Sequence, residues 1–280
     1  MIDLHLHTKH SDGFKTVSEV LTECEQAGLL AISITDHDSI DAYVELKNPE
    51  VRKLFSGKIL HGVELSAIYK GVIIHILGYG INLDTINKEK FFTIEDLLKF
   101  QKESLTGKFA SFGVNARVTG DNSYAMIDSL IEISKENIDK LPTINFSLIE
   151  GRSVQSSFFW KNMANVESAF YIDYSQVFQH PLEAIKTIRD SGGKAILAHP
   201  YAYGKDSEMV LESFIGEVDG VECYHTQINK QQSEYLIDLC KQRNLIITGG
   251  SDYHGEGTSF INSQNVPDHL LNQFDCGKFV

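Results

Sequence analysis

Short apolar runs alternate with amphipathic helical patterns in the first and last thirds of this 280-residue chain, and this alternation restricts its fold more than any other feature. Helical patterns begin at the capping box Thr16-x-x-Glu19, at Pro181 and at Lys230. Strands that alternate with helices pair in parallel through right-handed crossovers, so the pattern predicts an α/β fold, either a barrel or a doubly wound sheet. The seven predicted strands are 1–7, 30–35, 59–65, 72–77, 194–198, 218–224 and 245–248.

The alternation stops between about residues 84 and 180, where the pattern is mainly helical over 93–105, 124–135 and 154–169. We therefore predict one domain made of residues 1–83 and 181–280, with residues 84–180 as a helical insertion that caps it. The insertion holds the single tryptophan, Trp160, which we expect to be buried in the insertion core rather than stacked on a ligand.

Histidines and carboxylates gather where the predicted strands end. The carboxyl ends of parallel strands meet on one side of such a fold, so these groups should face one mouth. His5 and His7 are two residues apart on a strand and project side by side, and Asp252 and His254 repeat the spacing. The candidate metal ligands are His5, His7, Asp12, His37, Glu64, His75, His199, Asp252 and His254.

Mixed imidazole and carboxylate donors suit zinc, manganese or iron better than calcium or magnesium. The nine candidates exceed what one ion can use, so we predict two or three divalent ions, with the carboxylate of Glu64 as the bridge. The histidines at 10, 61, 180 and 269 lack such surroundings and are predicted to be structural or exposed.

Composition limits the kinds of partner and environment that we expect for this chain. The formal net charge of −13 argues against binding along a long nucleic acid. No apolar run reaches the length of a membrane helix, and the N-terminus has the pattern of a strand rather than of a signal peptide. The four cysteines are scattered without CxxC spacing, which fits a reducing, cytoplasmic environment.

The motifs HLHTKHSDG, ITDHDS, GVELSA, HILGY, AILAHP and GGSDYHG occur in this order, and together they resemble the PHP (polymerase and histidinol phosphatase) family. The resemblance implies a distorted (β/α)7 barrel with the insertion between strands four and five, and a trinuclear metal centre. It also implies a division of the ligands among three ions: His5, His7, Glu64 and Asp252 for the first; Glu64, His75 and His199 for the second; Asp12, His37 and His254 for the third.

Chain length and the position of the insertion are similar to the small phosphoesterase branch that acts on nucleotides. This likeness implies a phosphatase for a 5′-mononucleotide or a nucleoside 3′,5′-bisphosphate. It also implies a phosphate-binding basic residue shortly before Pro181, where this sequence has Tyr171-Ile172-Asp173-Tyr174 instead.

The expected reaction is hydrolysis of a small phosphate monoester by a hydroxide that bridges metal ions, with Glu64 and Asp252 as the central catalytic carboxylates. A metal-bound water, His225 or Asp36 could protonate the leaving group. His225 ends a predicted strand and should face the mouth. Asp36 and Asp38 flank His37, and we favour them as partners that orient imidazoles. Candidate substrate contacts are Arg152, Lys161, Tyr201 and His225.

Other functions remain open from the sequence. They are an exonuclease-like phosphodiesterase acting on oligonucleotide ends, a histidinol-phosphatase-like activity, a non-catalytic module that assists a partner, and an amidohydrolase-type C–N hydrolase. A degenerate module would be expected to lack ligands, whereas all nine candidates are present.

Overall fold

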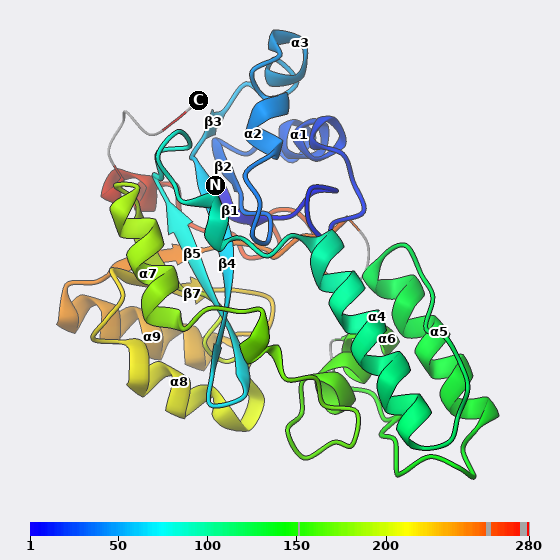
Figure 1. Cartoon of the computed structure of the whole chain (residues 1–280). Helices are drawn as coiled ribbons and strands as arrows, with labels where there is room; N and C mark the ends of the chain where they lie inside the picture. Colours follow the sequence, from blue (N-terminus) through cyan, green and yellow to red (C-terminus); the bar gives the residue numbers. More distant parts are fainter. Residues whose placement is uncertain (151, 256–258, 275–278, 280) are drawn as a thin grey trace.

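The computed structural model describes residues 1–150, 152–255, 259–274 and 279. Its strands and helices follow the predicted alternation (Figure 1). The strands are β1 (Ile2–Leu6), β2 (Ala31–Ile34), β3 (Lys58–Ile59), β4 (Gly62–Tyr69), β5 (Val72–Tyr79), β6 (Lys194–Leu197), β7 (Gly220–Tyr224) and β8 (Ile246–Gly249). The α-helices are α1 (Val17–Gln26), α2 (Ala42–Glu45), α3 (Pro49–Arg52), α4 (Ile94–Ser111), α5 (Ser123–Glu136), α6 (Val154–Phe158), α7 (Pro181–Asp190), α8 (Ser207–Phe214) and α9 (Lys230–Arg243). Short 3-10 segments are η1 (Lys88–Lys90), η3 (Tyr174–Gln176), η4 (Gly204–Asp206) and η5 (Asp268–Gln273), and η2 (Phe159–Met163) is π-helical.

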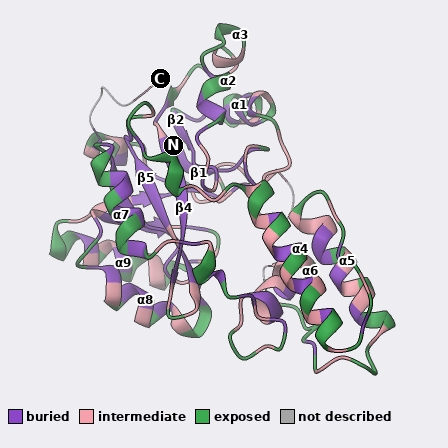
Figure 2. Ribbon diagram, in the orientation of Figure 1, coloured by how far each residue is buried: buried purple, intermediate pink, exposed green. Residues whose placement is uncertain are grey.

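The strands form two sheets. One has the order β1-β2-β3 with parallel pairing, and the other has the order β4-β5-β6-β7-β8. Isolated parallel bridges between Leu6 and Tyr253 and between His37 and Glu64 link the two sheets. The predicted α/β fold is confirmed, but the ladders of the described residues do not close into one seven-stranded ring. Helices cover the outer faces, and the strands are mostly buried (Figure 2).

The expectation of parallel pairing is wrong for the middle of the chain. β4 pairs with β5 in antiparallel fashion, and β5 is also antiparallel to β6. The hairpin turn is Lys70-Gly71, with φ of 52° and 81°. Positive φ at both central residues is the two-residue hairpin turn that matches the twist of antiparallel strands. A two-residue loop cannot make a parallel crossover, which needs a dozen or more residues.

The hairpin also changes the count of strands. The predicted strand 59–65 is divided into β3, which pairs with β2, and β4, which pairs with β5. In the β4–β5 register Glu64 lies opposite Leu77 and Ser66 opposite His75. Because residues two apart on a strand share a face, Glu64 and His75 project from the same side of the hairpin. The antiparallel pairing therefore brings a mid-strand histidine beside Glu64, rather than one at a carboxyl end.

Residues 84–180 are mainly helical, as predicted, and α4, α5 and α6 form a lobe beside the sheets (Figure 1). The lobe has an apolar core of its own, built around Leu105, Phe109 and Met126. Ile68 and Ile73, next to the hairpin turn, extend into that core, so β4–β5 anchors the lobe. The expected helix over 154–169 ends earlier, as α6 and η2 end at Met163. Within the described residues, no helix is both long and apolar enough to cross a membrane.

Candidate metal centre

The structure brings the nine candidate ligands together. His5 lies on β1, Glu64 on β4 and His75 on β5, whereas the others lie in loops that follow β1, β2, β6 and β8. Neighbouring imidazole rings are 4.3 to 5.8 Å apart between centroids, as in the pairs His7–His254 and His5–His199. Residues from both sheets and both ends of the chain therefore share one site. Their role as metal ligands is a proposal that the contacts below support.

Glu64 is at the centre of the group. Its Oε1 lies 3.1 Å from Nε2 of His199 and 3.3 Å from Nδ1 of His75. Its Oε2 lies 3.0 Å from Nε2 of His5 and 3.3 Å from Nε2 of His7. Nδ1 of His37 also lies 3.3 Å from Oε2. The two oxygens thus face different sets of imidazoles, which is the arrangement that a carboxylate bridging two cations requires.

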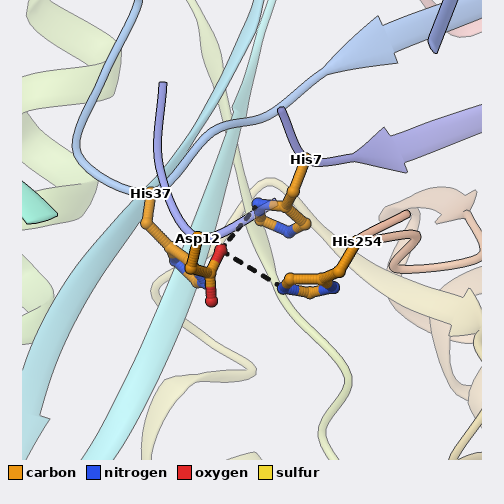
Figure 3. A group of neighbouring side chains, drawn as sticks. All are labelled: His7, Asp12, His37 and His254. Carbon is orange, nitrogen blue, oxygen red and sulfur yellow. Dashed lines mark ion pairs between the residues drawn. The ribbon is translucent and has the colours of Figure 1, made fainter. Parts of the chain in front are cut away.

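Asp12 gathers a second set of imidazoles, shown in Figure 3. Its Oδ1 is 3.3 Å from Nε2 of His254 and 3.8 Å from Nδ1 of His7, and its Oδ2 is 3.9 Å from Nε2 of His37. These four residues offer donor atoms that all lie within 4.8 Å of one another. The set contains the third group implied by the resemblance and adds His7 to it.

Asp252 joins the two sets. Its Oδ1 is 3.1 Å from Nε2 of His7 and 3.4 Å from Nε2 of His5. With Glu64, these residues form another group whose donor atoms lie within 4.8 Å of one another, and it matches the first group implied by the resemblance. The backbone of Asp252 has a φ of 53°. Aspartate and asparagine tolerate this left-handed conformation better than most residues.

Four buried imidazole nitrogens of the group have no hydrogen-bond partner among the described residues. In the part of the chain that the structure describes, both ring nitrogens of His7, Nδ1 of His37 and Nδ1 of His199 are buried and make no hydrogen bond. Buried polar atoms are nearly always satisfied by a partner. A zinc, manganese or iron ion would satisfy imidazole nitrogens that lie unpaired beside carboxylates. Several buried His, Asp and Glu groups could therefore hold metal ions.

Charges within the group follow from the same contacts. Burial opposes ionisation of Glu64, but the imidazoles of His5 and His37 hold its pKa well below the usual range. Burial likewise opposes protonation of His7, but the carboxylates of Asp252 and Glu64 raise its pKa to about 10. Metal ligands bind in their deprotonated forms, so protonation of His7 would compete with metal binding.

One side of the group is closed and the other is open. The side chains of His5 and His7 are fully buried and that of Glu64 is 1% exposed. Asp12 and His254 are 29% and 23% exposed. The partly exposed residues, which also include Asp252 (22%), His37 (20%) and His75 (16%), form a rim around a buried floor, and this rim is the side open to a substrate.

Asp36 does not have the position expected of a proton donor. Its carboxylate accepts hydrogen bonds from the backbone N–H of Thr8 (2.6 Å), the hydroxyl of Thr8 (2.7 Å) and the hydroxyl of Ser11 (2.7 Å). These contacts fix the loop that carries Asp12, rather than an imidazole as we expected. Asp38 similarly accepts from the backbone N–H of Ser66.

His225 also differs from the expectation that it faces the mouth. Its side chain is fully buried. Its Nδ1 accepts from the backbone N–H of Gln227 (3.1 Å), and its Nε2 lies 3.3 Å from Oδ2 of Asp252. A ring whose Nδ1 accepts carries its proton on Nε2 when neutral. His225 is therefore placed to donate to Asp252 from the buried side of the site rather than to contact a substrate.

The candidate substrate contacts divide into one near the site and two away from it. Arg152 donates to Oε1 of Gln227 (2.6 Å) and to the carbonyl of Ala202 (3.1 Å), and its guanidinium lies 5.0 Å from the centroid of the Trp160 ring. Burial lowers its pKa, while attraction to Asp252 acts in the opposite direction. Trp160 packs against the insertion core, as expected, but it is only partly buried and its ring also contacts this arginine.

Tyr201 packs against the core of the sheet, and the ionisable groups that act on its hydroxyl are Glu208 and Tyr235. Lys161 donates to Ser147 and to the carbonyl of Leu148, within the insertion. Neither is placed as a substrate contact. Tyr174, from the stretch where a basic residue was expected, is buried in the insertion core.

Sequence reasoning missed Glu222. This residue lies on β7 with its carboxylate fully buried, 2.9 Å from Nδ1 of His5. A charged residue inside an otherwise apolar strand could have identified it, since buried carboxylates are rare unless they have partners. The histidines predicted to be structural behave differently from the candidates: His180 caps α7 through the N–H of Leu182, and His10 pairs with Glu45.

Comparison with known proteins shows the family and the fold. Residues 3–237 match the PHP domain family. The fold is similar to the structure described as a metal-dependent phosphoesterase from Bifidobacterium adolescentis, with a TM-score of 0.72, 21% identity, and coverage of 97% of this chain and 94% of that one.

The relatives with named activities differ from one another in activity, but each is matched over most of its length. A phosphoribosyl 1,2-cyclic phosphate 1,2-diphosphodiesterase from Eggerthella lenta is 25% identical, over 91% of this chain and 94% of its own. A 5′-3′ exoribonuclease from Haemophilus influenzae is 26% identical, over 90% and 89%. A 3′,5′-nucleoside bisphosphate phosphatase from Chromobacterium violaceum is 22% identical, over 91% and 88%. The chain belongs to the PHP domain family of metal-dependent phosphoesterases.

Proposed function

We propose that this phosphoesterase hydrolyses a small phosphorylated nucleotide, either a 5′-mononucleotide or a nucleoside 3′,5′-bisphosphate. The observation that carries the proposal is the position of Glu64, whose two carboxylate oxygens face separate sets of imidazoles next to an open rim. The three relatives act, by their names, on a cyclic phosphoribosyl ester, on RNA and on a nucleoside bisphosphate. Phosphate esters of ribose compounds are the chemistry that these activities share.

Divalent ions would be held by three groups of residues. The first is His5, His7, Glu64 and Asp252; the second is Glu64, His75 and His199; the third is Asp12, His37 and His254 with His7 beside them. When bound, such ions lower the pKa of a water molecule and stabilise the charge that develops on phosphoryl oxygens. Zinc, manganese and iron all suit this donor set.

The protein's own residues would bind and orient the phosphate. Arg152 extends from the insertion to Gln227, two residues after His225, and Gln227 and the carbonyl of Ala202 fix its guanidinium. An arginine held in this way is pre-organised for charge-assisted hydrogen bonds to phosphate oxygens. It would thus perform the role for which the family resemblance implied a basic residue nearer Pro181. The buried floor of His5 and Glu64 excludes bulk water from the far side.

A substrate panel tests the proposal. The purified chain, loaded in turn with Zn²⁺, Mn²⁺ or Fe²⁺, should release phosphate from AMP or from adenosine 3′,5′-bisphosphate. It should be inactive after chelation and recover when the metal is returned. Hydrolysis confined to an RNA oligomer, with no phosphate released from either nucleotide, would contradict the monoesterase assignment.

That outcome would favour a second candidate, a phosphodiesterase acting on oligonucleotide ends. The observation that supports it is the likeness to the exoribonuclease over nine-tenths of this chain. The net charge of −13 disfavours contact with a long RNA track but allows a grip on one terminal phosphate at the rim.

Replacement of Arg152 with alanine should raise the KM for the nucleotide about 10- to 100-fold, because a charge-assisted hydrogen bond contributes roughly 1.5–3 kcal/mol. The zinc content of the protein should not change, because Arg152 offers no metal ligand. Lys161→Ala is the matched control: it removes another cation from the insertion, one that donates to Ser147 and Leu148, and its KM should equal that of the unaltered chain. Steady-state kinetics and metal analysis of both variants decide the point, and equal KM values would contradict the assignment of Arg152.

A further inference from the structure

Glu222 makes two hydrogen bonds that hold candidate ligands from different strands. Its Oε1 accepts from Nδ1 of His5 (2.9 Å), and its Oε2 accepts from the backbone N–H of His199 (2.8 Å). Both partners are donors, and a carboxylate offers two acceptors without a donor of its own. The carboxylate therefore matches these two partners as no neutral side chain of the same shape could.

The contact with His5 determines which ring nitrogen is free. A proton on Nδ1, donated to Glu222, leaves the lone pair on Nε2. Nε2 is the nitrogen that faces the cluster, 3.0 Å from Oε2 of Glu64 and 3.4 Å from Oδ1 of Asp252. The other tautomer would place a proton on the nitrogen that has to bind the ion.

The contact with His199 acts on the backbone. His199 has a φ of 26°, which few residues with a side chain adopt, and it precedes Pro200. Glu222 accepts from the N–H of this strained residue, which lies two residues after the end of β6. Glu222 therefore ties the β6 loop to β7 at the point where the His199 imidazole turns toward Oε1 of Glu64.

We infer that Glu222 is a positioning residue of the metal centre: it fixes the tautomer of His5 and the backbone of His199, so that Nε2 of each ring is presented to an ion. The inference rests on the metal centre of the proposed function but not on the identity of the substrate. Partners of this kind typically change metal affinity 10- to 100-fold when they are replaced.

Glu222→Gln is the decisive variant. Glutamine keeps the shape but has only one acceptor oxygen, so either His199 loses its partner or the amide donates to Nδ1 of His5 and forces the proton onto Nε2. Zn²⁺ titration against a chromophoric chelator should show zinc affinity lower by about 10- to 100-fold. The far-UV circular dichroism of the metal-free protein should not change. Glu222→Asp, which keeps two acceptors, should bind zinc more tightly than Glu222→Gln.

Asp219→Asn is the matched control. The Asp219 carboxylate also ties β6 to β7, since it accepts from the N–H of Ala195 (2.9 Å), but at the other end of these strands and beside Arg189. This variant should lose stability without losing zinc affinity. Zinc affinity of Glu222→Gln equal to that of the unaltered chain would overturn the inference. Failure of the unaltered chain to bind zinc, manganese or iron would instead overturn the metal centre itself.

A measurement on the unaltered chain covers the case in which Glu222→Gln does not fold. With ¹⁵N-labelled histidine, the zinc-loaded protein should show a proton on Nδ1 of His5 that exchanges slowly with solvent. An Nδ1 of His5 without a proton would overturn the inference as well.

Discussion

Replacement of Glu64 with glutamine should strongly reduce both the metal content and the turnover of the protein. Glutamine keeps the size of the side chain but removes the charge and one of the two acceptor oxygens that face His5, His7, His75 and His199. Bound metal ions contribute several kcal/mol to the stabilisation of charge in a transition state. Each ~1.4 kcal/mol is a factor of ten in rate, so kcat should fall on the order of a thousandfold.

Metal analysis by mass spectrometry and steady-state kinetics on the purified variant measure both effects. Glu45→Gln is the control, because Glu45 also pairs with a histidine, Nε2 of His10 at 2.7 Å, but on the exposed surface. It should retain full metal content and rate. A Glu64→Gln protein with undiminished metal content and kcat would show that Glu64 does not bridge ions.

Replacement of Asp252 with asparagine should have an effect of similar size. It removes the charge of the side chain without changing the conformation of the backbone. Asp252 has a φ of 53°, a conformation that asparagine also tolerates, so the loop should keep its path. The variant loses the anion whose Oδ1 lies 3.1 Å from His7 and 3.4 Å from His5. We expect fewer bound ions per chain and a kcat lower on the order of a thousandfold.

Asp38→Asn provides a close control for this substitution. Asp38 also has a positive φ, 47°, and lies next to His37, but its carboxylate accepts from the backbone N–H of Ser66 rather than facing the imidazoles. It should keep most of its metal and activity. Equal losses in the two variants, measured by metal content and phosphate release, would mean that the loops rather than the Asp252 charge are responsible.

The candidate site was largely predictable because its histidines and carboxylates recur at strand ends, two residues apart, which places their side chains on one face. His5 and His7 share a strand direction, and Asp252 and His254 repeat the spacing more than two hundred residues later. The α/β fold followed from the same alternation of strands and helices. These features are local, so a single sequence contains them.

Pairing across the chain was not predictable in the same way. The Lys70-Gly71 turn was overlooked, and with it the antiparallel hairpin that places His75 beside Glu64. The orientations of two polar side chains could not be predicted either. Asp36 accepts hydrogen bonds from Thr8 and Ser11, and His225 lies against Oδ2 of Asp252 on the buried side of the site. The two side-chain orientations depend on partners more than twenty residues away along the chain.

Arg152 and Glu222 show the difference between what the sequence determines and what only the tertiary structure decides. The sequence by itself determined the chemistry of the site, because donor atoms of the right kinds at strand ends are fixed by residue type and by the two-residue period of a strand. Only the tertiary structure decided which groups meet. It gave Glu222 its two donors, from β1 and from the loop after β6, and it brought Arg152 from the insertion to Gln227. The physical reason is that hydrogen bonds and ion pairs act over about 3 Å, and no spacing along the chain specifies which distant segments come that close.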